Sequence, residues 1–349
     1  MTDSLTSLFV LSLLALPTGS ALAAEREADP LSLGALPERP AAGPVRDRVI
    51  DGQPPAYATA SGDVNSGEYQ TPDGHTVHVH VSAAYTDPDV RAQELVNFLG
   101  SLLHADEMSQ LSASLLTPRQ LRRTCGGGAL ACYFPDAEEI AVSAVEGGFL
   151  EPPREFVIAH EYGHHVAANR SNKPWTALAR GTKRWSTHER ICRAIKQHKI
   201  RPRFYFENPG EAFAESFAFY HYPDTIDWIW DIARPDAGSY DAIRNDVLSP
   251  WARRTSSSSA GTLSRENRRH VIRLDTPLDG RLEVRLDGPP GADFDLELLR
   301  PNRDRVLKRA AHPGPDETLR YTVCGNREVR ILVHRFKGAG AFELTTARP

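Results

Sequence analysis

The sequence predicts an α+β domain followed by a small all-β sandwich. Apolar residues recur at helical spacing over residues 152–168 and again over 208–219, which predicts two core helices in the first domain. Beyond residue 268 the apolar period changes to two, which predicts the short strands of a second domain. The 349 residues are 40% apolar and 25% charged, so the chain can form more than one core.

Residues 1–23 are predicted to be a signal peptide. Leu8 to Leu16 form an apolar core too short to span a bilayer, and residues 21–23 offer small side chains for cleavage. The signal is atypical because Asp3 precedes this core and no Lys or Arg does; a buried N-terminal helix is the alternative. No other stretch approaches transmembrane length, so we expect a secreted protein, extracellular or periplasmic, with no membrane span.

Residues 24–74 are rich in Pro, Ala, Gly and Asp without clear periodicity, which is typical of a propeptide or a disordered arm. Residues 76–81 then alternate strictly and predict a strand with valines on one side. His75, His78 and His80 suggest a second metal site, but polar residues on an exposed strand face account for them.

The sequence patterns that predict the elements before the first core helix are weaker. Asp87-Pro88 begins a predicted helix that extends to Leu102, and residues 137–142 predict a strand. Pro152 and Pro153 suit the first turn of the next helix, and the polar cluster over residues 169–174 ends it.

That helix contains His160-Glu161-Tyr162-Gly163-His164, an HExxH pattern. Residues four apart lie on one helix face, so both imidazoles can bind one zinc ion while Glu161 lies beside the bound water. We therefore predict His160 and His164 as zinc ligands and Glu161 as the general base. The alternative is a helix whose histidines are merely half-buried.

A catalytic zinc needs a third protein ligand, and residues 208–219 offer two acids on one helix face. Glu211 is the predicted third ligand, and Glu215 the acceptor that orients a ligand histidine through its other ring nitrogen. The reverse order fits the spacing too. Alternatively, Glu211 forms a capping box with Asn208 and Glu215 is a surface acid.

HEYGHH followed by GEAFAESFA resembles the gluzincin branch of the zincin metallopeptidases. In the lethal-factor-like and Pro-Pro-endopeptidase-like enzymes, the second helix also carries Glu-x-Phe-Ala-Glu, with its first Glu on the metal. The resemblance implies that Glu211 binds zinc, that residues 75–252 form a zincin-like domain, and that an edge strand of that domain pairs with extended peptide substrate.

Those enzymes place a tyrosine seven residues before the ligand glutamate, where this sequence has Phe204. Tyr205 follows one position later and is the predicted donor to the oxyanion. Tyr220, His221 and Tyr222, from the far end of the same helix, are the alternatives.

The predicted function is that of a secreted zinc endopeptidase, in which a zinc-activated water attacks the peptide bond and Glu161 takes its proton. A protein or peptide is the expected substrate, and a monomer the expected state. The net charge of −4 and the lack of a dense Lys/Arg block give no reason to expect nucleic acid. The alternative is a secreted binding or adhesive protein whose zincin domain is inactive.

All four cysteines follow the signal, as in an exported protein. Cys125 and Cys132 flank a glycine-rich loop and predict a local disulfide, with two free thiols as the alternative. Cys192 and Cys324 are far apart in sequence and form either an interdomain link or no bond at all.

The composition changes after Trp251. Residues 253–265 are predicted to be a Ser-rich flexible linker, and residues 266–349 a β-sandwich. The run from Gly291 to Leu298, with two glycines before a last strand, resembles the bacterial pre-peptidase C-terminal domain of secreted peptidases. Asp293 and Asp295 offer oxygens that suit Ca²⁺, although a turn and an exposed strand face explain them without a metal.

Overall fold

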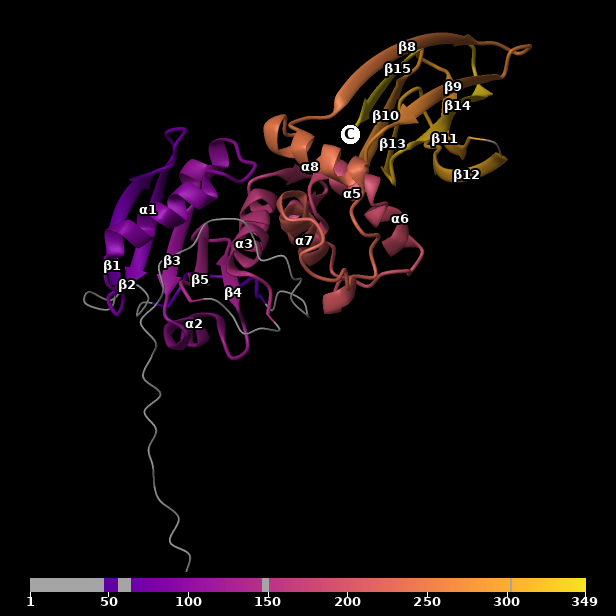
Figure 1. Ribbon diagram of the computed structural model, residues 1–349. Coiled ribbons are helices and arrows are strands. Elements are labelled where there is room, and N and C mark those ends of the chain that lie inside the picture. The colour runs from indigo at the N-terminus through magenta and orange to yellow at the C-terminus, as the bar shows by residue number, and fades with distance from the viewer. Residues whose placement is uncertain (1–46, 56–63, 146–150, 302) are drawn as a thin grey trace, which may run out of the picture.

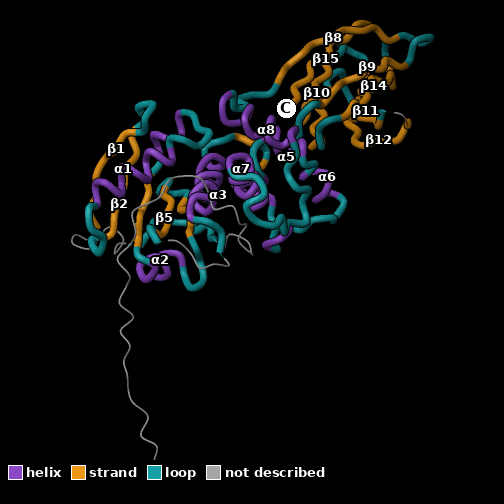
Figure 2. The backbone as a smooth tube through the Cα atoms, in the orientation of Figure 1, coloured by secondary structure: helices purple, strands orange, loops and turns teal. Residues whose placement is uncertain are grey.

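The computed structural model describes residues 47–55, 64–145, 151–301 and 303–349. A helix-rich lobe with a mixed sheet ends at α8, and an all-β lobe follows, as Figures 1 and 2 show. The prediction of an α+β protein with a C-terminal all-β region is confirmed. The predicted signal peptide lies outside the described residues.

The first lobe contains five paired strands, a short two-stranded ribbon and the helices. Its strands are β1 Val64–Gln70, β2 Thr76–Ser82, β3 Ser112–Leu116, β4 Ala131–Phe134, β5 Glu139–Ser143, β6 Ser171–Asn172 and β7 Trp175–Thr176. Its helices are α1 Pro88–Leu99, η2 Asp106–Gln110, α2 Pro118–Cys125, α3 Arg154–Ala168, α4 Ala177–Arg180, α5 Lys183–His188, α6 Ile191–Lys196, η3 Tyr205–Glu207, α7 Pro209–His221 and α8 Ala237–Leu248.

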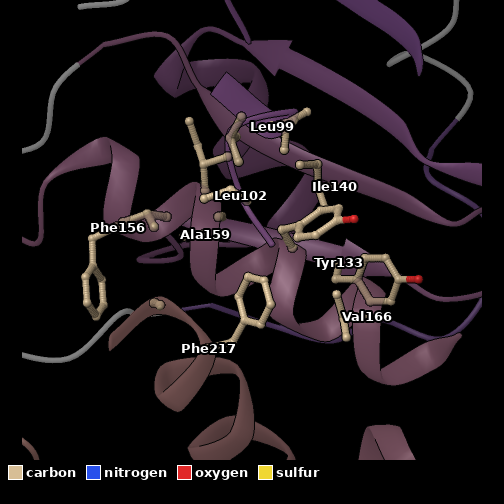
Figure 3. Packing of buried hydrophobic residues seen from close by; sticks show 14 of the residues in the cluster. Leu99, Leu102, Tyr133, Ile140, Phe156, Ala159, Val166 and Phe217 are labelled. Carbon is tan, nitrogen blue, oxygen red and sulfur yellow. The ribbon is translucent and has the colours of Figure 1, made fainter. Parts of the chain in front are cut away.

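The five strands pair in the order β1-β2-β3-β5-β4. β2, β3 and β5 are parallel, whereas β1 and β4 at the two edges run antiparallel to their neighbours. The valines of β2 are buried, as its alternation predicted. Leu99, Ile140, Phe156 and Phe217 meet in the core between this sheet and the helices (Figure 3). Of the two edge strands, β4 is the one that packs against α3.

α3 and α7 are the two predicted core helices, and they pack directly on each other at Gly163. A Cβ atom added there would lie 2.9 Å from the Cα atom of Ala214 in α7. A larger residue would therefore push the two helices apart, so the glycine allows the close approach of α7.

The prediction of a disordered arm over residues 24–74 is wrong for two parts of that range. Residues 64–70 form β1, which pairs along its whole length with β2. Residues 48–50 lie along β4, where Val49 forms a parallel bridge with Tyr133. Composition indicated no structure because β1 has few apolar side chains and none that is buried, and because residues 48–50 obtain their backbone partner from the distant strand β4.

The second lobe consists of two four-stranded antiparallel sheets, β13-β10-β15-β8 and β12-β11-β14-β9. Apolar residues of both sheets form its core, at the alternating positions that the sequence indicated. The strands are β8 Thr255–Leu263, β9 Arg269–Thr276, β10 Gly280–Asp287, β11 Asp293–Arg300, β12 Arg303–Ala310, β13 Glu317–Val323, β14 Arg327–Lys337 and β15 Gly340–Arg348.

The prediction of a flexible linker over residues 253–265 is wrong. Residues 255–263 form β8, which pairs with all nine residues of β15. β8 is an edge strand and most of its side chains are exposed, so serines fit where a buried strand would need apolar residues. The connection between the lobes is correspondingly short.

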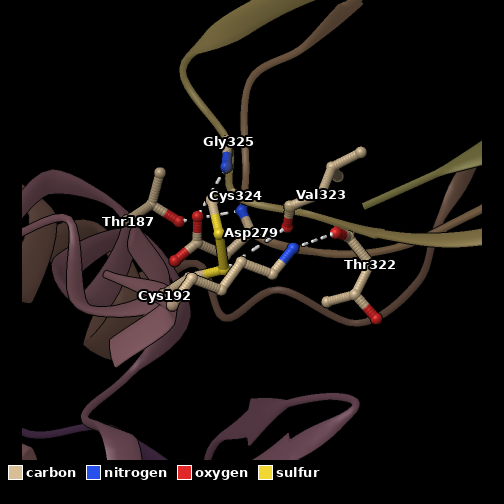
Figure 4. Close-up of a disulfide and its surroundings, with 8 residues drawn as sticks. Thr187, Cys192, Asp279, Thr322, Val323, Cys324 and Gly325 are labelled. Atoms are coloured by element: carbon tan, nitrogen blue, oxygen red, sulfur yellow. Dashed lines mark hydrogen bonds between the residues drawn. A yellow bond between two sulfur atoms is a disulfide. The ribbon is translucent and has the colours of Figure 1, made fainter. Parts of the chain in front are cut away.

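Both cysteine pairs are disulfides. Cys125–Cys132 closes the loop between α2 and β4, which confirms the predicted bridge. Cys192–Cys324 links α6 to the residue after β13 and thereby joins the two lobes (Figure 4). Two disulfides fit an oxidising compartment. Within the described ranges, no helix is long and apolar enough to cross a membrane.

Polar contacts surround the interdomain disulfide. The hydroxyl of Thr187 accepts a hydrogen bond from the Asp279 amide at 3.0 Å, and Lys196 Nζ donates to the Thr322 carbonyl at 2.7 Å. The Asp279 carboxylate in turn accepts from the Gly325 amide at 2.6 Å (Figure 4). The two lobes are therefore held in contact at α5 and α6.

Candidate metal centre

α3 places the two motif histidines on one buried face. The ring centroids of His160 and His164 are 5.0 Å apart, as expected for residues one helical turn apart. Both side chains are buried. Their Nε2 atoms face the same group of carboxylate oxygens, so the two rings can bind one ion.

α7 supplies two glutamates that contact different atoms. Glu211 Oε2 lies 3.6 Å from His160 Nε2 and 3.3 Å from His164 Nε2. Glu215 Oε2 instead lies 2.9 Å from His160 Nδ1, on the far side of that ring. Asn208 caps this helix by accepting a hydrogen bond from the Gly210 amide, so the cap does not require Glu211.

Asp47 is a fourth member of the cluster. Its Oδ2 atom lies 3.0 Å from His164 Nε2 and 3.4 Å from His160 Nε2, and its side chain is fully buried. Sequence reasoning missed this residue because it lies more than a hundred positions before the motif, among many other acids and without any spacing pattern. No signal in the single sequence identifies it.

The spacing of these atoms fits a divalent metal ion. One ligand atom from each of Asp47, His160, His164 and Glu211 lies within 4.8 Å of the other three. Ligands 2.0–2.2 Å from an ion at tetrahedral corners are separated by about 3.3–3.6 Å, close to the distances given above. Two neutral imidazoles and two carboxylates would balance the charge of Zn²⁺. The cluster could therefore hold a metal ion.

Several buried polar atoms here lack a hydrogen-bond partner in the described structure. They are His160 Nε2, Glu211 Oε2, both carboxylate oxygens of Glu161, His164 Nδ1 and Glu215 Oε1. Leaving such atoms unpaired costs about 1–3 kcal/mol each, and more for charged groups. A metal ion would satisfy the first two atoms, and a water molecule beside it would satisfy Glu161.

The electrostatics show how strongly these groups interact. Burial alone would raise the pKa of Asp47, yet the two histidines hold it well below its ordinary value. Burial would lower the pKa of His164, but Glu211 and Asp47 raise it to about 9. A metal ion that binds His164 would therefore displace a proton from it.

Glu161 differs from the other acids because neither of its carboxylate oxygens has a hydrogen-bond partner among the described residues. Complete burial raises its pKa well above the ordinary value, and the nearby charge of Asp47 adds to the effect. A buried carboxyl with a raised pKa is suited to taking and returning a proton near neutral pH.

Tyr205 lies at the same cluster. Its hydroxyl donates a hydrogen bond to Asp47 Oδ1 at 3.1 Å, and burial, with Asp47 next, raises its pKa. The alternatives pack elsewhere: Tyr220 against Tyr240, and Tyr222 against Phe98. His221 Nε2 accepts a hydrogen bond from the Leu103 amide, so it too faces away from the cluster.

The histidines near β2 are arranged differently. His78 and His80 belong to neither described metal-sized cluster, whereas His75 lies close to Asp73 and His104. Asp73 is half-exposed, and His104 Nε2 already contacts the Gly100 carbonyl oxygen at 3.1 Å. This group is therefore less buried than the centre on α3, and His104 Nδ1 is its one buried atom without a hydrogen-bond partner among the described residues.

Asp293 and Asp295 are also outside the metal-sized clusters that the described residues form. A separate cavity of about 370 Å³ lies between α2 and α3, and Leu121, Leu130 and Ile158 are among its lining residues. None of the residues of the cluster on α3 and α7 lines it.

No protein-family profile matches this sequence, and neither does any curated protein. Solved structures match about a quarter of the chain. The pre-peptidase C-terminal domain of a Bacillus anthracis collagenase is 12% identical over 26% of this chain and 88% of that one, with a TM-score of 0.24. The mitogen of Yersinia pseudotuberculosis is 18% identical over 28% and 87% respectively, with a TM-score of 0.23.

A third match is the periplasmic lysozyme inhibitor PliG of Aeromonas hydrophila, 7% identical over 28% of this chain and 86% of that one, with a TM-score of 0.19. Likenesses at these TM-scores carry no functional argument. The resemblance to zincins therefore stays a prediction from the two helices.

Proposed function

We propose that this chain is a secreted zinc-dependent endopeptidase. The observation that carries the proposal is the buried, unpaired carboxyl of Glu161 beside a group of residues whose spacing fits a metal ion. A site that only binds a metal has no use for such a carboxyl, because burying it without a partner destabilises the fold. In a hydrolytic site the Glu161 carboxyl has a role as the general base.

In this proposal His160, His164 and Glu211 bind the ion, and Glu215 accepts from His160 Nδ1 to hold the ring in place. Zinc, when bound, supplies Lewis-acid activation of water and of the scissile carbonyl. Glu161 takes a proton from the attacking water and passes it to the leaving amine.

Tyr205 would donate a hydrogen bond to the oxygen that becomes negatively charged. Its hydroxyl already donates to a carboxylate oxygen of Asp47, the other oxygen of which lies among the ligand atoms. A donor placed in advance near developing charge lowers the barrier, and removal of one such donor costs 10²–10³ in kcat in well-studied hydrolases.

The test uses mature protein recovered from the medium of expressing cells. We expect one zinc per chain, casein hydrolysis that a chelator abolishes, and recovery on adding zinc. E161Q should retain zinc and lose hydrolysis, whereas H160A should lose both. Mature protein without zinc, or E161Q with parental activity, would contradict the proposal. Persistence of activity after complete zinc removal would contradict it as well.

A further inference from the structure

Residues 47–53 lie along the edge of the sheet that β4 forms. The first residue of this segment reaches the metal centre. Tyr133, in the edge strand β4, donates its amide to the Arg48 carbonyl at 3.0 Å and accepts from the Ile50 amide at 2.9 Å. An extended peptide binds a sheet edge through backbone hydrogen bonds of this kind. The segment therefore occupies the place where a peptide would add to β4.

The downstream end of the segment is attached as well. The Gly52 amide donates to Asp136 Oδ2 at 2.9 Å, and the Gln53 side chain donates to the Asp136 carbonyl at 3.0 Å. Ile50 packs against the apolar cluster that contains the Cys125–Cys132 disulfide. Contacts thus continue from the metal centre to the turn after β4.

At the upstream end, the carboxylate of Asp47 bridges the two halves of the candidate active site. Oδ2 lies among the ligand atoms, 3.0 Å from His164 Nε2, while Oδ1 accepts from the Tyr205 hydroxyl. A carboxylate at this position fills the coordination place that a catalytic zinc site keeps open. Its other oxygen also accepts the hydrogen bond that Tyr205 would otherwise donate to the oxyanion.

We propose that residues 47–53 inhibit the enzyme from within the chain, with Asp47 as a fourth metal ligand and the following strand in the place of substrate. This inference rests on the peptidase function proposed above. The intact chain is latent, and displacement or loss of the segment opens the site.

Two features argue for inhibition rather than for a permanent four-ligand structural site. Glu161 remains buried and unpaired beside the cluster, which a structural site does not require. In addition, a side-chain carboxyl rather than a peptide carbonyl reaches the ligand atoms, so no scissile bond lies there. The segment can therefore block the site without being cut.

The experiment compares full chains whose residues 47–53 are shown by mass spectrometry to be intact. The variants are D47A, which removes the fourth ligand, and I50P, which removes the amide that donates to Tyr133. D51A is the matched control, because Asp51 is an exposed acid in the same segment. Each protein is loaded with Co²⁺ and titrated with acetohydroxamate, which needs an open coordination position. Casein hydrolysis is measured on the zinc form.

We expect D47A to bind acetohydroxamate at least tenfold more tightly than the parent, seen as a change in the visible Co²⁺ spectrum, and to hydrolyse casein at least tenfold faster. I50P should move in the same direction and D51A should match the parent. Equal hydroxamate affinity in D47A and the parent overturns the inference.

The two proposals fail in different ways. If the intact parent already hydrolyses casein as fast as D47A, latency is wrong and the peptidase function stands. If D47A binds acetohydroxamate tightly but hydrolyses nothing, the peptidase function is overturned, and latency with it.

Discussion

Glu215 and Glu211 show how two identical residues, one helical turn apart, come to have different roles. The Glu211 carboxylate faces the Nε2 atoms of both histidines, and the Glu215 carboxylate faces the Nδ1 atom of one. The difference arises because the His160 ring lies between them and presents a different nitrogen to each. Glu211 can therefore bind a metal directly, whereas Glu215 can orient a ligand histidine.

We predict that E215A lowers zinc affinity by about 10–100-fold, because His160 loses the acceptor that holds its ring in place. E215Q should lose less, since the amide oxygen can still accept from Nδ1. Competition with a calibrated chelator measures both constants. An E215A protein with parental affinity would show that this contact does not orient the ligand.

His221 predicts a pH dependence of stability that is independent of the metal. Burial lowers its pKa to about 4, below the ordinary value of about 6.5. Its stabilising contribution is therefore complete above pH 6.5 and is lost as the pH falls toward 4, because the unfolded chain binds the proton first. Between pH 7 and pH 5 the loss is about 2 kcal/mol.

The variant H221Q keeps an acceptor for the Leu103 amide and cannot take up a proton. Urea unfolding at the two pH values should therefore show a smaller decrease for H221Q than for the parent, by about 2 kcal/mol. H198Q, at an exposed histidine, is the control and should behave like the parent. Equal pH slopes for the parent and H221Q would show that His221 is not the group responsible.

At the scale of elements, the centre depends on the close approach of α3 and α7. These helices carry three of the four clustered residues, and Gly163 lies where their backbones meet. Separating the helices by a few tenths of an ångström would move Glu211 away from both histidines. Helix packing therefore controls the ligand distances.

We predict that G163A destabilises the fold by about 1–3 kcal/mol and weakens zinc binding, although alanine alone favours a helix by about 1 kcal/mol. The added Cβ would meet backbone atoms of Ala214, which cannot move as an exposed side chain can. G127A is the control, because nothing lies within 4 Å of its added Cβ. Urea unfolding and chelator competition give the two quantities, and a G163A protein as stable and as tight-binding as G127A would contradict the prediction.

The Ser-rich stretch at residues 255–263 shows how an element can be decided by its neighbours. Composition indicates a flexible linker, but β15 offers a full row of backbone donors and acceptors, and the stretch pairs with it as β8. Serine tolerates an exposed edge strand because little apolar burial is needed there.

At the scale of the whole molecule, the Cys192–Cys324 disulfide links the lobes across 132 residues, whereas Cys125–Cys132 spans only seven. In the chain-entropy model the first removes about 5 kcal/mol of unfolded-state entropy and the second about 2.4 kcal/mol. The long link is accordingly the more stabilising of the two.

We expect the double variant C192S/C324S to unfold at a lower temperature than C125S/C132S. Thermal unfolding followed by circular dichroism, which reports the helical first lobe and the β-rich second lobe at different wavelengths, provides the measurement. The same curves should show the two lobes melting separately only in C192S/C324S. A larger decrease in C125S/C132S would mean that the local loop matters more than the interdomain link.

The sequence by itself determined the elements whose signal is local. The HExxH spacing, the second helix with its two glutamates and the alternating strands all follow from short-range periodicity, which depends on backbone geometry alone. The Cys125–Cys132 bridge is equally local. These features suffice to predict two domains and three of the four residues that cluster at the centre.

Only the tertiary structure decided the position of Asp47, the contact of Tyr205 with it, and the pairing of residues 48–50 with β4. Each joins segments many residues apart, so no local pattern encodes it. The carboxylate of Asp47 can lie in a fully buried site because two histidines and a tyrosine compensate its desolvation. Such compensation exists only after the chain has folded.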